Sequence, residues 1–291
     1  MKSLNIIGCG RVGRTLGRLW HSQGTFRVQD VLTGSKHTAN DAVEFIGQGR
    51  AVSTLAAMRA ADLWMLAVPD RQIAQVAGAL AQTTLARQHS ALAFHCSGAL
   101  TTSELSPLLA LGWQVASAHC VLSFASPQAA LRQFAGTPCA LEGTASGELQ
   151  VPFEHIGALC FSLTAEHKLL YHAGAVFATN FVPVLQALAN QLWQDSGVPE
   201  PIAAQLKATL LKNAVDNILA LGPAGALTGP AARGDTALVD RQGAAVTRWN
   251  ATAGDAYKAL SQLAATLAAN SFQNNLPAAK QDISGSDLRT K

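Results

Sequence analysis

In the first half of the chain, short apolar runs alternate with amphipathic stretches. The apolar runs predict strands at Leu4–Ile7, Val28–Leu32, Ala51–Val52, Leu63–Val68, Ser90–Phe94, Gln114–Ala118 and Pro138–Leu141. Apolar residues three or four positions apart predict helices at Val12–Ser22, Asn40–Ile46, Gln72–Leu80 and Thr101–Leu111. Buried strands that alternate with helices are typical of a parallel sheet covered on both faces. The pattern therefore predicts a doubly wound α/β domain.

The pattern changes near Val151, where strand-like runs give way to alanine and leucine at helical spacing. Helices are predicted at Glu166–Asp195, Pro201–Leu221, Thr236–Trp249 and Asp255–Asn270. Pro183 should kink the first of them, Asp235 should cap the third, and the tail after Phe272 should be frayed. We therefore expect an α/β domain at residues 1–150 and an all-helical domain at residues 151–291.

Composition narrows the class of protein. The 291 residues carry a net charge of +3, only 13% are charged, and no basic run occurs, so neither nucleic acid nor an anionic membrane is an expected partner. The five cysteines form no C-x-x-C pair, which predicts no metal site and a reduced, cytoplasmic setting. The most apolar window, residues 173–189, contains Asn180, Pro183 and Gln186 and is expected to be too polar for a bilayer.

The stretch "IIGCGRVGRTLGRLW" places Gly8, Gly10 and Gly13 in G-x-G-x-x-G spacing, between a predicted strand and a predicted helix. The first glycine permits a tight turn, the second lets a diphosphate approach the backbone, and the third lets helix and strand pack closely. Arg11 and Val12 begin the helix whose positive end would hold the diphosphate. The motif therefore predicts a dinucleotide site.

The end of the second strand should select the dinucleotide. Thr33, Ser35 and Lys36 suit the 2′-phosphate of NADP, which we favour. If the strand ends early, Asp30 would instead hold a ribose hydroxyl, and the cofactor would be NAD. In "AVPD", Val68 and Pro69 should border the adenosine half of the cofactor, and Asp70 should cap the next helix.

Two further motifs, "YHAGAVFATNF" (171–181) and "ALTGPAARGD" (226–235), carry a family resemblance. With the glycine motif, they resemble the superfamily of 6-phosphogluconate, β-hydroxyacid and prephenate dehydrogenases and pyrroline-5-carboxylate reductases. Within it, the chain is most similar to Rossmann-like proteins that carry a DUF2520 domain. The resemblance implies an NADP-binding Rossmann domain and a helical domain that dimerises and binds substrate.

The resemblance also implies residues at the reacting end. Ser97 and His119 match a serine and a histidine that contact substrate in prephenate dehydrogenases, although Cys120 replaces the usual proline. A histidine with a pKa near neutral suits proton exchange during hydride transfer. Alternatively, Ser97 only forms a turn and His119 only caps a strand, while Cys96 and Cys120 are better explained as small apolar fillers.

The helix predicted at 166–195 offers a second match. Asn180 aligns with the asparagine of the Lys-x-x-Asn motif of β-hydroxyacid dehydrogenases, but Phe177 replaces the lysine, which puts hydroxyacid chemistry in doubt and leaves imine reduction open. His172 is a candidate substitute, or else an interfacial histidine. Arg233 is either a substrate-carboxylate clamp or a partner of Asp235.

These observations predict an NADP-dependent oxidoreductase that acts on a small carbonyl or imine substrate, expected to bear a carboxylate. Ser97, His119, Asn180 and His172 would form the catalytic end, and the chain would be a homodimer. The alternative is a non-catalytic, NADP-binding regulatory protein.

Overall fold

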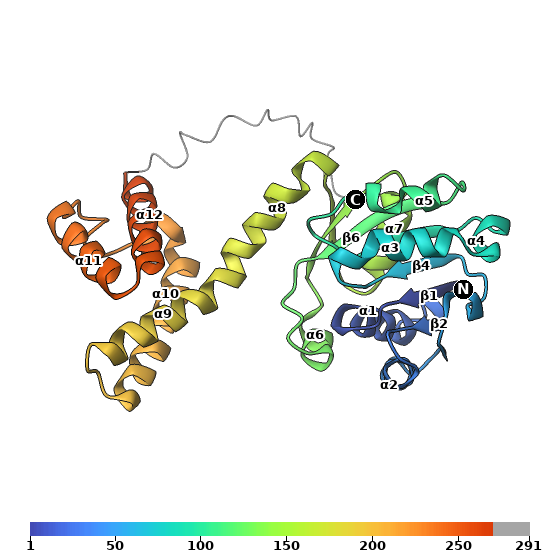
Figure 1. Ribbon diagram of the computed structural model, residues 1–291, viewed down its shortest axis with the longest axis horizontal. Coiled ribbons are helices and arrows are strands. Elements are labelled where there is room, and N and C mark those ends of the chain that lie inside the picture. Colours follow the sequence, from blue (N-terminus) through green and yellow to red (C-terminus); the bar gives the residue numbers. More distant parts are fainter. Residues whose placement is uncertain (270–291) are drawn as a thin grey trace, which may run out of the picture. The chain divides into compact units, whose positions relative to one another are not determined.

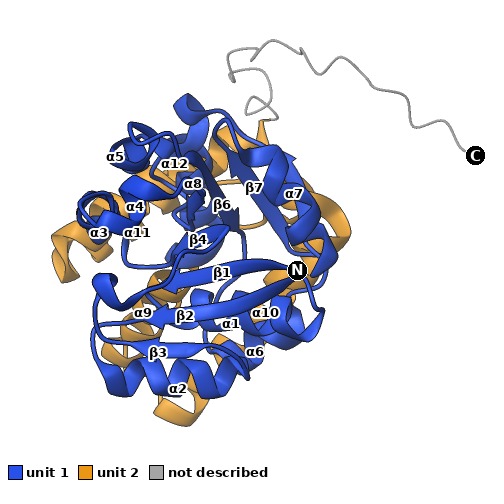
Figure 2. Cartoon of the chain, turned by 90° about the vertical axis from the view of Figure 1, so that its right-hand side faces the viewer, with its two compact units in different colours: residues 1–181 blue, residues 182–291 orange. Residues whose placement is uncertain are grey.

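The computed structural model describes residues 1–269 and divides the chain into two compact units. Unit 1 comprises Met1–Phe181, and unit 2 comprises Val182–Lys291 (Figures 1 and 2). Unit 1 thus includes residues 151–181, which the sequence pattern assigned to the helical half.

Unit 1 contains a sheet of eight strands in the order β3-β2-β1-β4-β5-β6-β7-β8. The strands are β1 (Lys2–Ile7), β2 (Phe26–Leu32), β3 (Arg50–Val52), β4 (Leu63–Leu66), β5 (Leu92–His95), β6 (Gln114–Cys120), β7 (Pro138–Glu142) and β8 (Leu159–Ser162). Strands β1 to β6 are parallel and follow the 3-2-1-4-5-6 order of a doubly wound Rossmann sheet, which confirms the predicted fold class.

The sequence prediction missed the far edge of this sheet. β7 runs antiparallel to β6, and β8, which pairs parallel with β7, lies where strands were no longer expected. β8 has only four residues, and its short apolar run at residues 159–161 cannot be told from part of a helix by periodicity alone. The preceding helix α7 (Ser146–His155) was also missed because Pro152 interrupts its helical pattern.

Helices cover both faces of the sheet (Figure 1). In β4, Leu63 and Met65 belong to one apolar cluster, and Trp64 and Leu66 belong to the other, as expected when successive side chains point to opposite faces. The first cluster includes residues of α1 (Arg11–Ser22), α2 (Lys36–Ile46) and α7, with α6 (Pro127–Gln133) against α1. The second includes residues of α3 (Asp70–Ala81), α4 (Thr84–Gln88), the 3₁₀ turn η2 (Thr102–Leu105) and α5 (Ser106–Leu109). The last two elements replace the single helix predicted at Thr101–Leu111.

The chain then forms consecutive helical segments. They are the 3₁₀ turn η3 (Ala165–His167), α8 (Lys168–Ala175), the π-helical segment η4 (Val176–Asn180) and α9 (Phe181–Asp195). The irregularity expected at Pro183 takes the form of η4, which ends three residues before the proline. Because Pro183 has no N–H and its ring crowds the carbonyl four residues earlier, the preceding turn widens.

Unit 2 contributes the rest of α9, α10 (Glu200–Ala226), α11 (Thr236–Trp249) and α12 (Ala251–Ala268). Asp235 caps α11 as predicted, because its carboxylate accepts a hydrogen bond from Leu238 N. Gly222, with a φ of +71°, breaks α10 directly after the predicted end at Leu221. α12 starts four residues earlier than predicted because Asn250 caps it. Asn270 and the polar tail after Phe272 lie outside the described residues.

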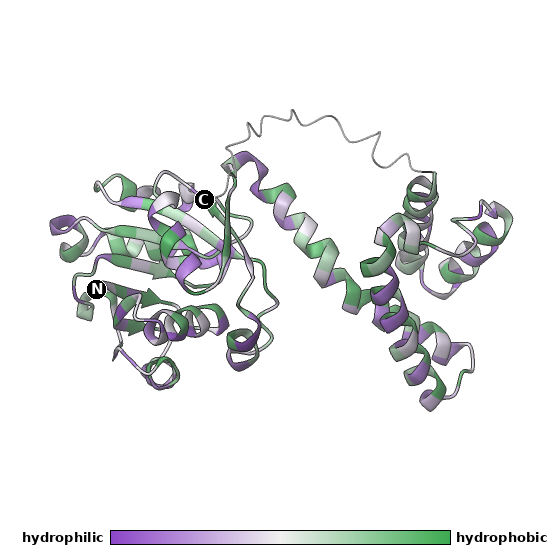
Figure 3. Cartoon of the chain, turned by 180° about the vertical axis from the view of Figure 1, so that it is seen from behind, coloured by the Kyte–Doolittle hydropathy of each residue, from purple (hydrophilic) through white to green (hydrophobic). Residues whose placement is uncertain are grey.

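Few apolar side chains of unit 2 are covered. Among its described residues, Ala203 and Ala253 are the buried apolar side chains. Large apolar residues are exposed instead, as the green stretches of Figure 3 indicate: Val184, Leu185, Ile202, Leu210, Val215, Ile218, Leu219, Leu221, Leu260 and Leu263. Such a face is typical of a surface that another molecule covers.

The helical stretch Ala165–Asp195 is also long and apolar enough, by length and composition alone, to cross a membrane. An 18-residue window of this stretch has a mean hydropathy of 1.2, so the stretch is less polar than the sequence analysis expected. None of that window is buried inside the protein. A single stretch of this kind is weak evidence for a membrane span.

Candidate functional site

The glycine motif forms the turn between β1 and α1, and this turn packs against the end of β4. Gly8 has a φ of +78°, and a Cβ there would lie 2.5 Å from Val68 Cγ1 and 2.7 Å from Val68 N. A Cβ at Gly13 would lie 2.8 Å from Gly8 O. Both positions therefore require glycine.

Gly10 is different, because a Cβ there would meet no protein atom within 4 Å. It precedes the first turn of α1, which has no side-chain cap and no acidic residue. Gly10 lines a cavity of about 950 Å³ together with Arg11, Val12, Arg14, Thr33, Val68 and Pro69. Uncapped helical N–H groups and two guanidinium groups suit an anion, so this cavity fits the diphosphate of a dinucleotide.

At the end of β2, two hydroxyl groups line the same cavity. Thr33 Oγ1 lies 2.6 Å from Thr38 Oγ1. Ser35 caps α2 through a hydrogen bond from Thr38 N, and neither Ser35 nor Lys36 is among the residues that line the cavity. Thr33, just after β2, and Thr38, in α2, are therefore the hydroxyl groups at this end of the cavity.

Asp30 is not available to a cofactor. β2 continues to Leu32, and the fully buried Asp30 carboxylate accepts hydrogen bonds from Arg59 Nη2 (2.7 Å) and Arg50 Nε (2.9 Å). Burial alone would raise the pKa of Asp30, but the hydrogen bonds and charge of the arginines outweigh it and hold the pKa below its ordinary value. The alternative in which Asp30 binds a ribose hydroxyl is therefore wrong.

Ser97 has its hydrogen-bonding capacity filled inside the chain. Its hydroxyl donates to Asp70 Oδ2 (2.8 Å) and accepts from Ala99 N (3.2 Å) and Leu100 N (3.0 Å). Asp70 is the first residue of α3 rather than its cap, because Pro69 occupies the capping position. The Asp70–Ser97 pair fixes the turn after β5.

His119 lies near the end of β6 in contact with α8. Its Nδ1 is 2.8 Å from Tyr171 Oη, and its ring meets that of His172 edge to face at 5.5 Å between centroids. Gly98 lies beneath both imidazoles: a Cβ there would come within 2.6 Å of His172 Nδ1 and 2.7 Å of His119 Cε1. Two predicted residues, His119 and His172, thus lie together over a turn in which position 98 has no room for a side chain.

The surroundings keep His119 neutral. Burial, then the neighbouring His172 and Lys168, lower the pKa of His119 to about 4. Burial raises the pKa of Tyr171 to about 12, so its hydroxyl remains protonated. The expectation that His119 has a pKa near neutral is therefore wrong, because the sequence did not show how deeply the ring is buried.

Two smaller cavities continue from the dinucleotide cavity. The first, of about 280 Å³, shares Val12 and Phe124 with the dinucleotide cavity, and His119 and His172 also line it. The second, of about 190 Å³, shares both histidines and is also lined by Thr179 and Asn180. His172 Nδ1 is buried and has no hydrogen-bond partner within residues 1–269. An unpaired buried nitrogen beside a cavity is typical of a site that a ligand completes.

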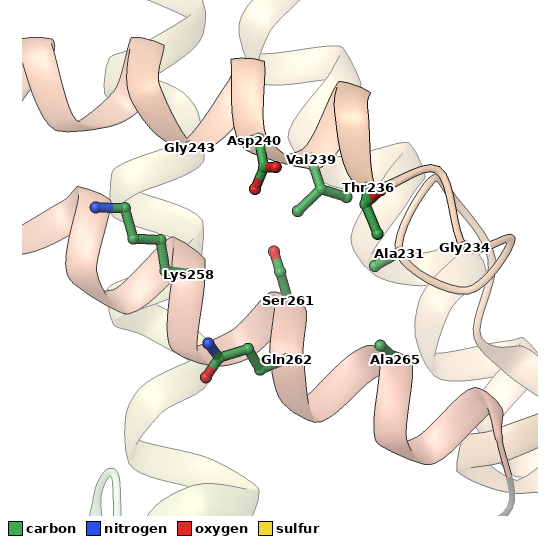
Figure 4. A pocket seen from close by; sticks show the side chains of 10 residues that line it. All are labelled: Ala231, Gly234, Thr236, Val239, Asp240, Gly243, Lys258, Ser261, Gln262 and Ala265. Carbon is green, nitrogen blue, oxygen red and sulfur yellow. The ribbon is translucent and has the colours of Figure 1, made fainter.

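Other predicted residues lie elsewhere. Phe177 is 63% exposed and lines neither histidine cavity. Arg233 is exposed in the turn before α11 in unit 2, and within the described chain no ion pair joins it to Asp235. A separate cavity of about 340 Å³ between α11 and α12 contains none of the predicted residues (Figure 4).

The sequence analysis missed Arg14, Thr38, Lys168 and Tyr171. A usable signal existed for the last two. Lys168, Tyr171 and His172 occupy positions i, i+3 and i+4, which place them on one face of α8.

The lowered histidine pKa predicts acid sensitivity. Burial also lowers the pKa of His95 to about 4, so the native state keeps both rings neutral, whereas an unfolded histidine takes up a proton near pH 6.5. Their contribution to stability is fully present above pH ~6.5 and is lost as the pH falls towards 4. Urea unfolding between pH 7.5 and 5 should show His119→Asn taking up about one fewer proton on unfolding than the wild type. The exposed His89→Asn is the control, and equal slopes for wild type and His119→Asn would contradict the neutral assignment.

Solved structures share this fold. Protein TM1727 from Thermotoga maritima is 27% identical, with a TM-score of 0.70 over 92% of this chain and 99% of its own. BF3122 from Bacteroides fragilis, a candidate NADP oxidoreductase, is 19% identical, with a TM-score of 0.71 over 91% of this chain and 98% of its own. An imine reductase from Myxococcus stipitatus in complex with NADP⁺ is 15% identical, with a TM-score of 0.61 over 94% and 95%.

No curated protein resembles the sequence closely enough to count as a match. Two family models do match: a Rossmann-like domain at residues 1–120, and the domain of unknown function DUF2520 at residues 137–264. The chain therefore carries a Rossmann-like domain followed by a domain of the DUF2520 family.

Proposed function

We propose that the chain is a nicotinamide-dinucleotide-dependent oxidoreductase that acts on a small substrate at the His119–His172 pocket. The observation that carries the proposal is the succession of cavities from the Gly10 turn to the unpaired His172 Nδ1, because it joins a dinucleotide cradle to a pocket that lacks one hydrogen-bond partner. The similar fold of an imine reductase bound to NADP⁺ supports it.

NADP is the proposed cofactor, in preference to NAD. The one acid in the second half of β2, Asp30, is committed to Arg50 and Arg59, so no β2 carboxylate would repel a 2′-phosphate. Hydroxyls of Thr33 and Thr38 line the cavity, and Arg11 and Arg14 add positive charge. A 2′-phosphate needs donors and cations of this kind.

The pocket suits reduction of a C=N bond better than that of a C=O bond. When bound, the reduced nicotinamide supplies the hydride. A carbonyl needs a proton on oxygen as it is reduced, and His119, whose pKa is about 4, is not an imidazolium ion at neutral pH and is therefore a poor general acid. A protonated imine already bears its proton, and the Asp70 carboxylate that lines the same cavity favours a cation.

In this scheme the chain positions the substrate. The neutral His119 ring, fixed through Tyr171, and the unpaired His172 Nδ1 bind the substrate nitrogen or a neighbouring polar group. Asn180 and Thr179 border the far end of the pocket. Within the described chain no lysine or arginine lines either histidine cavity, and the assignment of Arg233 to a substrate carboxylate stays a prediction.

The alternative, a regulatory protein that binds NADP without catalysis, draws support from the neutral state of His119. Measurement of substrate turnover distinguishes the oxidoreductase from the regulatory protein.

We further propose a soluble, cytoplasmic homodimer. Unit 2 leaves too few apolar side chains buried to be stable by itself, and a second copy would cover its apolar face. The same cover would account for the apolar stretch Ala165–Asp195 without a membrane.

The cofactor site is tested by Gly10→Ala. Its new methyl group points into open space in the free protein and should obstruct the diphosphate, so affinity should fall by about tenfold or more with the fold intact. Calorimetric titration with NADPH and NADH measures this, and NADPH should bind more tightly. Gly78→Ala, also in open space but in α3, is the control. Unchanged affinity in Gly10→Ala would refute the site, and equal or tighter NADH binding would refute the NADP preference.

Activity is tested by NADPH oxidation with panels of cyclic imines and keto acids. Cyclic imines should be reduced, and His119→Asn should lower kcat/KM by about 10²-fold while NADPH affinity is kept. His89→Asn should retain full activity. The wild-type rate should show no ionisation of His119 between pH 6 and 8. Tight NADPH binding without oxidation of any substrate would favour the regulatory alternative.

The oligomeric state is tested by light scattering at micromolar concentration. The wild type should show about twice the mass of one chain, and Leu219→Glu, at a side chain that is 81% exposed in unit 2, should shift it towards the monomer. Leu109→Glu, at an exposed residue of α5, should not. A monomeric wild type would refute the dimer.

A further inference from the structure

α8 begins with a lysine that is almost completely buried. The side chain of Lys168 is 2% exposed, and its ammonium group donates hydrogen bonds to Ser97 O (3.1 Å) and Ser117 Oγ (2.6 Å). Glu142 Oε2 lies 3.6 Å from the same nitrogen. The ammonium group therefore makes two hydrogen bonds inside the protein and a close ion pair with the Glu142 carboxylate.

These acceptors come from three segments that neighbour one another in the sheet: Ser97 follows β5, Ser117 lies in β6, and Glu142 ends β7. The buried Glu142 carboxylate also accepts hydrogen bonds from Thr102 N (3.0 Å), Thr102 Oγ1 (2.8 Å) and Ser117 Oγ (3.0 Å). Apolar side chains of similar size often stabilise a core as well as a buried ion pair does. A network of directional hydrogen bonds adds something that they lack, which is one fixed geometry.

The geometry that Lys168 fixes is that of the two histidines. Tyr171 and His172 lie one turn further along the same face of α8, where Tyr171 bonds His119 and His172 contacts it. Gly98 packs against both imidazole rings, and Lys168 donates a hydrogen bond to the carbonyl of Ser97, the residue directly before this glycine. One ammonium group thus fixes both the helix face and the turn over which the imidazoles lie.

We propose that Lys168 is a positioning residue for the His119–His172 site, acting with Glu142 to hold α8 against the 97–98 turn. The proposal rests on the function proposed above. Lys168 lines neither histidine cavity, so it acts on the substrate only through the residues that it holds.

The test uses the full-length chain with ¹⁵N-labelled histidine. Lys168→Met removes the ammonium group at nearly constant side-chain length. The double variant Lys168→Met with Glu142→Gln also removes the negative charge that the first substitution leaves unpaired, and it provides a folded protein if the single variant unfolds. In both, the His119 Nδ1 signal should lose its hydrogen-bonded shift, kcat should fall by about 10²-fold, and the NADPH dissociation constant should stay within about twofold. Lys207→Met, at an exposed lysine of α10, should change none of these.

Wild-type histidine signals and kcat in the double variant would overturn the proposal. If the wild type reduces no substrate, the proposed function fails separately, and the spectra alone decide the role of Lys168. Shifted His119 signals would then support positioning, and unchanged signals would refute it.

Discussion

The close approach of the β1–α1 turn to the end of β4 is the constraint on which the site depends. At Gly8 the two backbones leave no room for a side chain, so this contact fixes the position of the first turn of α1 relative to the sheet. Because β1, β4, β5 and β6 are parallel, the segments that follow them meet at the same edge. The glycine turn, the Ser97–Gly98 turn and His119 are neighbours for that reason.

Much of this arrangement was predictable from sequence. β1 to β6 are short apolar runs between helical patterns, and the glycine spacing marks the first turn, so local signals and fold agree there. β8 and α7 were missed because the apolar run of a four-residue edge strand is too short to identify it, and because Pro152 interrupts the helical pattern of α7. Tertiary contacts, not local patterns, define them.

The chemistry of the site was less predictable than its location. His119 and His172 were identified, but the neutral state of His119 depends on burial and on Lys168, which pattern analysis does not reveal. Asp30 seemed available because its two arginine partners are 20 and 29 residues away along the chain. A residue type suggests a reaction, whereas the surrounding charges decide which protonation state takes part.

The π-helical segment at Val176–Asn180 changes what a sequence motif in this region means. A Lys-x-x-Asn spacing describes two residues on one face only while the helix keeps 3.6 residues per turn. A π turn holds more residues, so it rotates the first position of the motif away from the last. Here position 180 borders the pocket while position 177 does not. A phenylalanine at 177 therefore does not displace a proton donor from the pocket of this chain: an altered helical pitch has moved that position out of the pocket, and His172, earlier on the same helical stretch, lines the pocket instead.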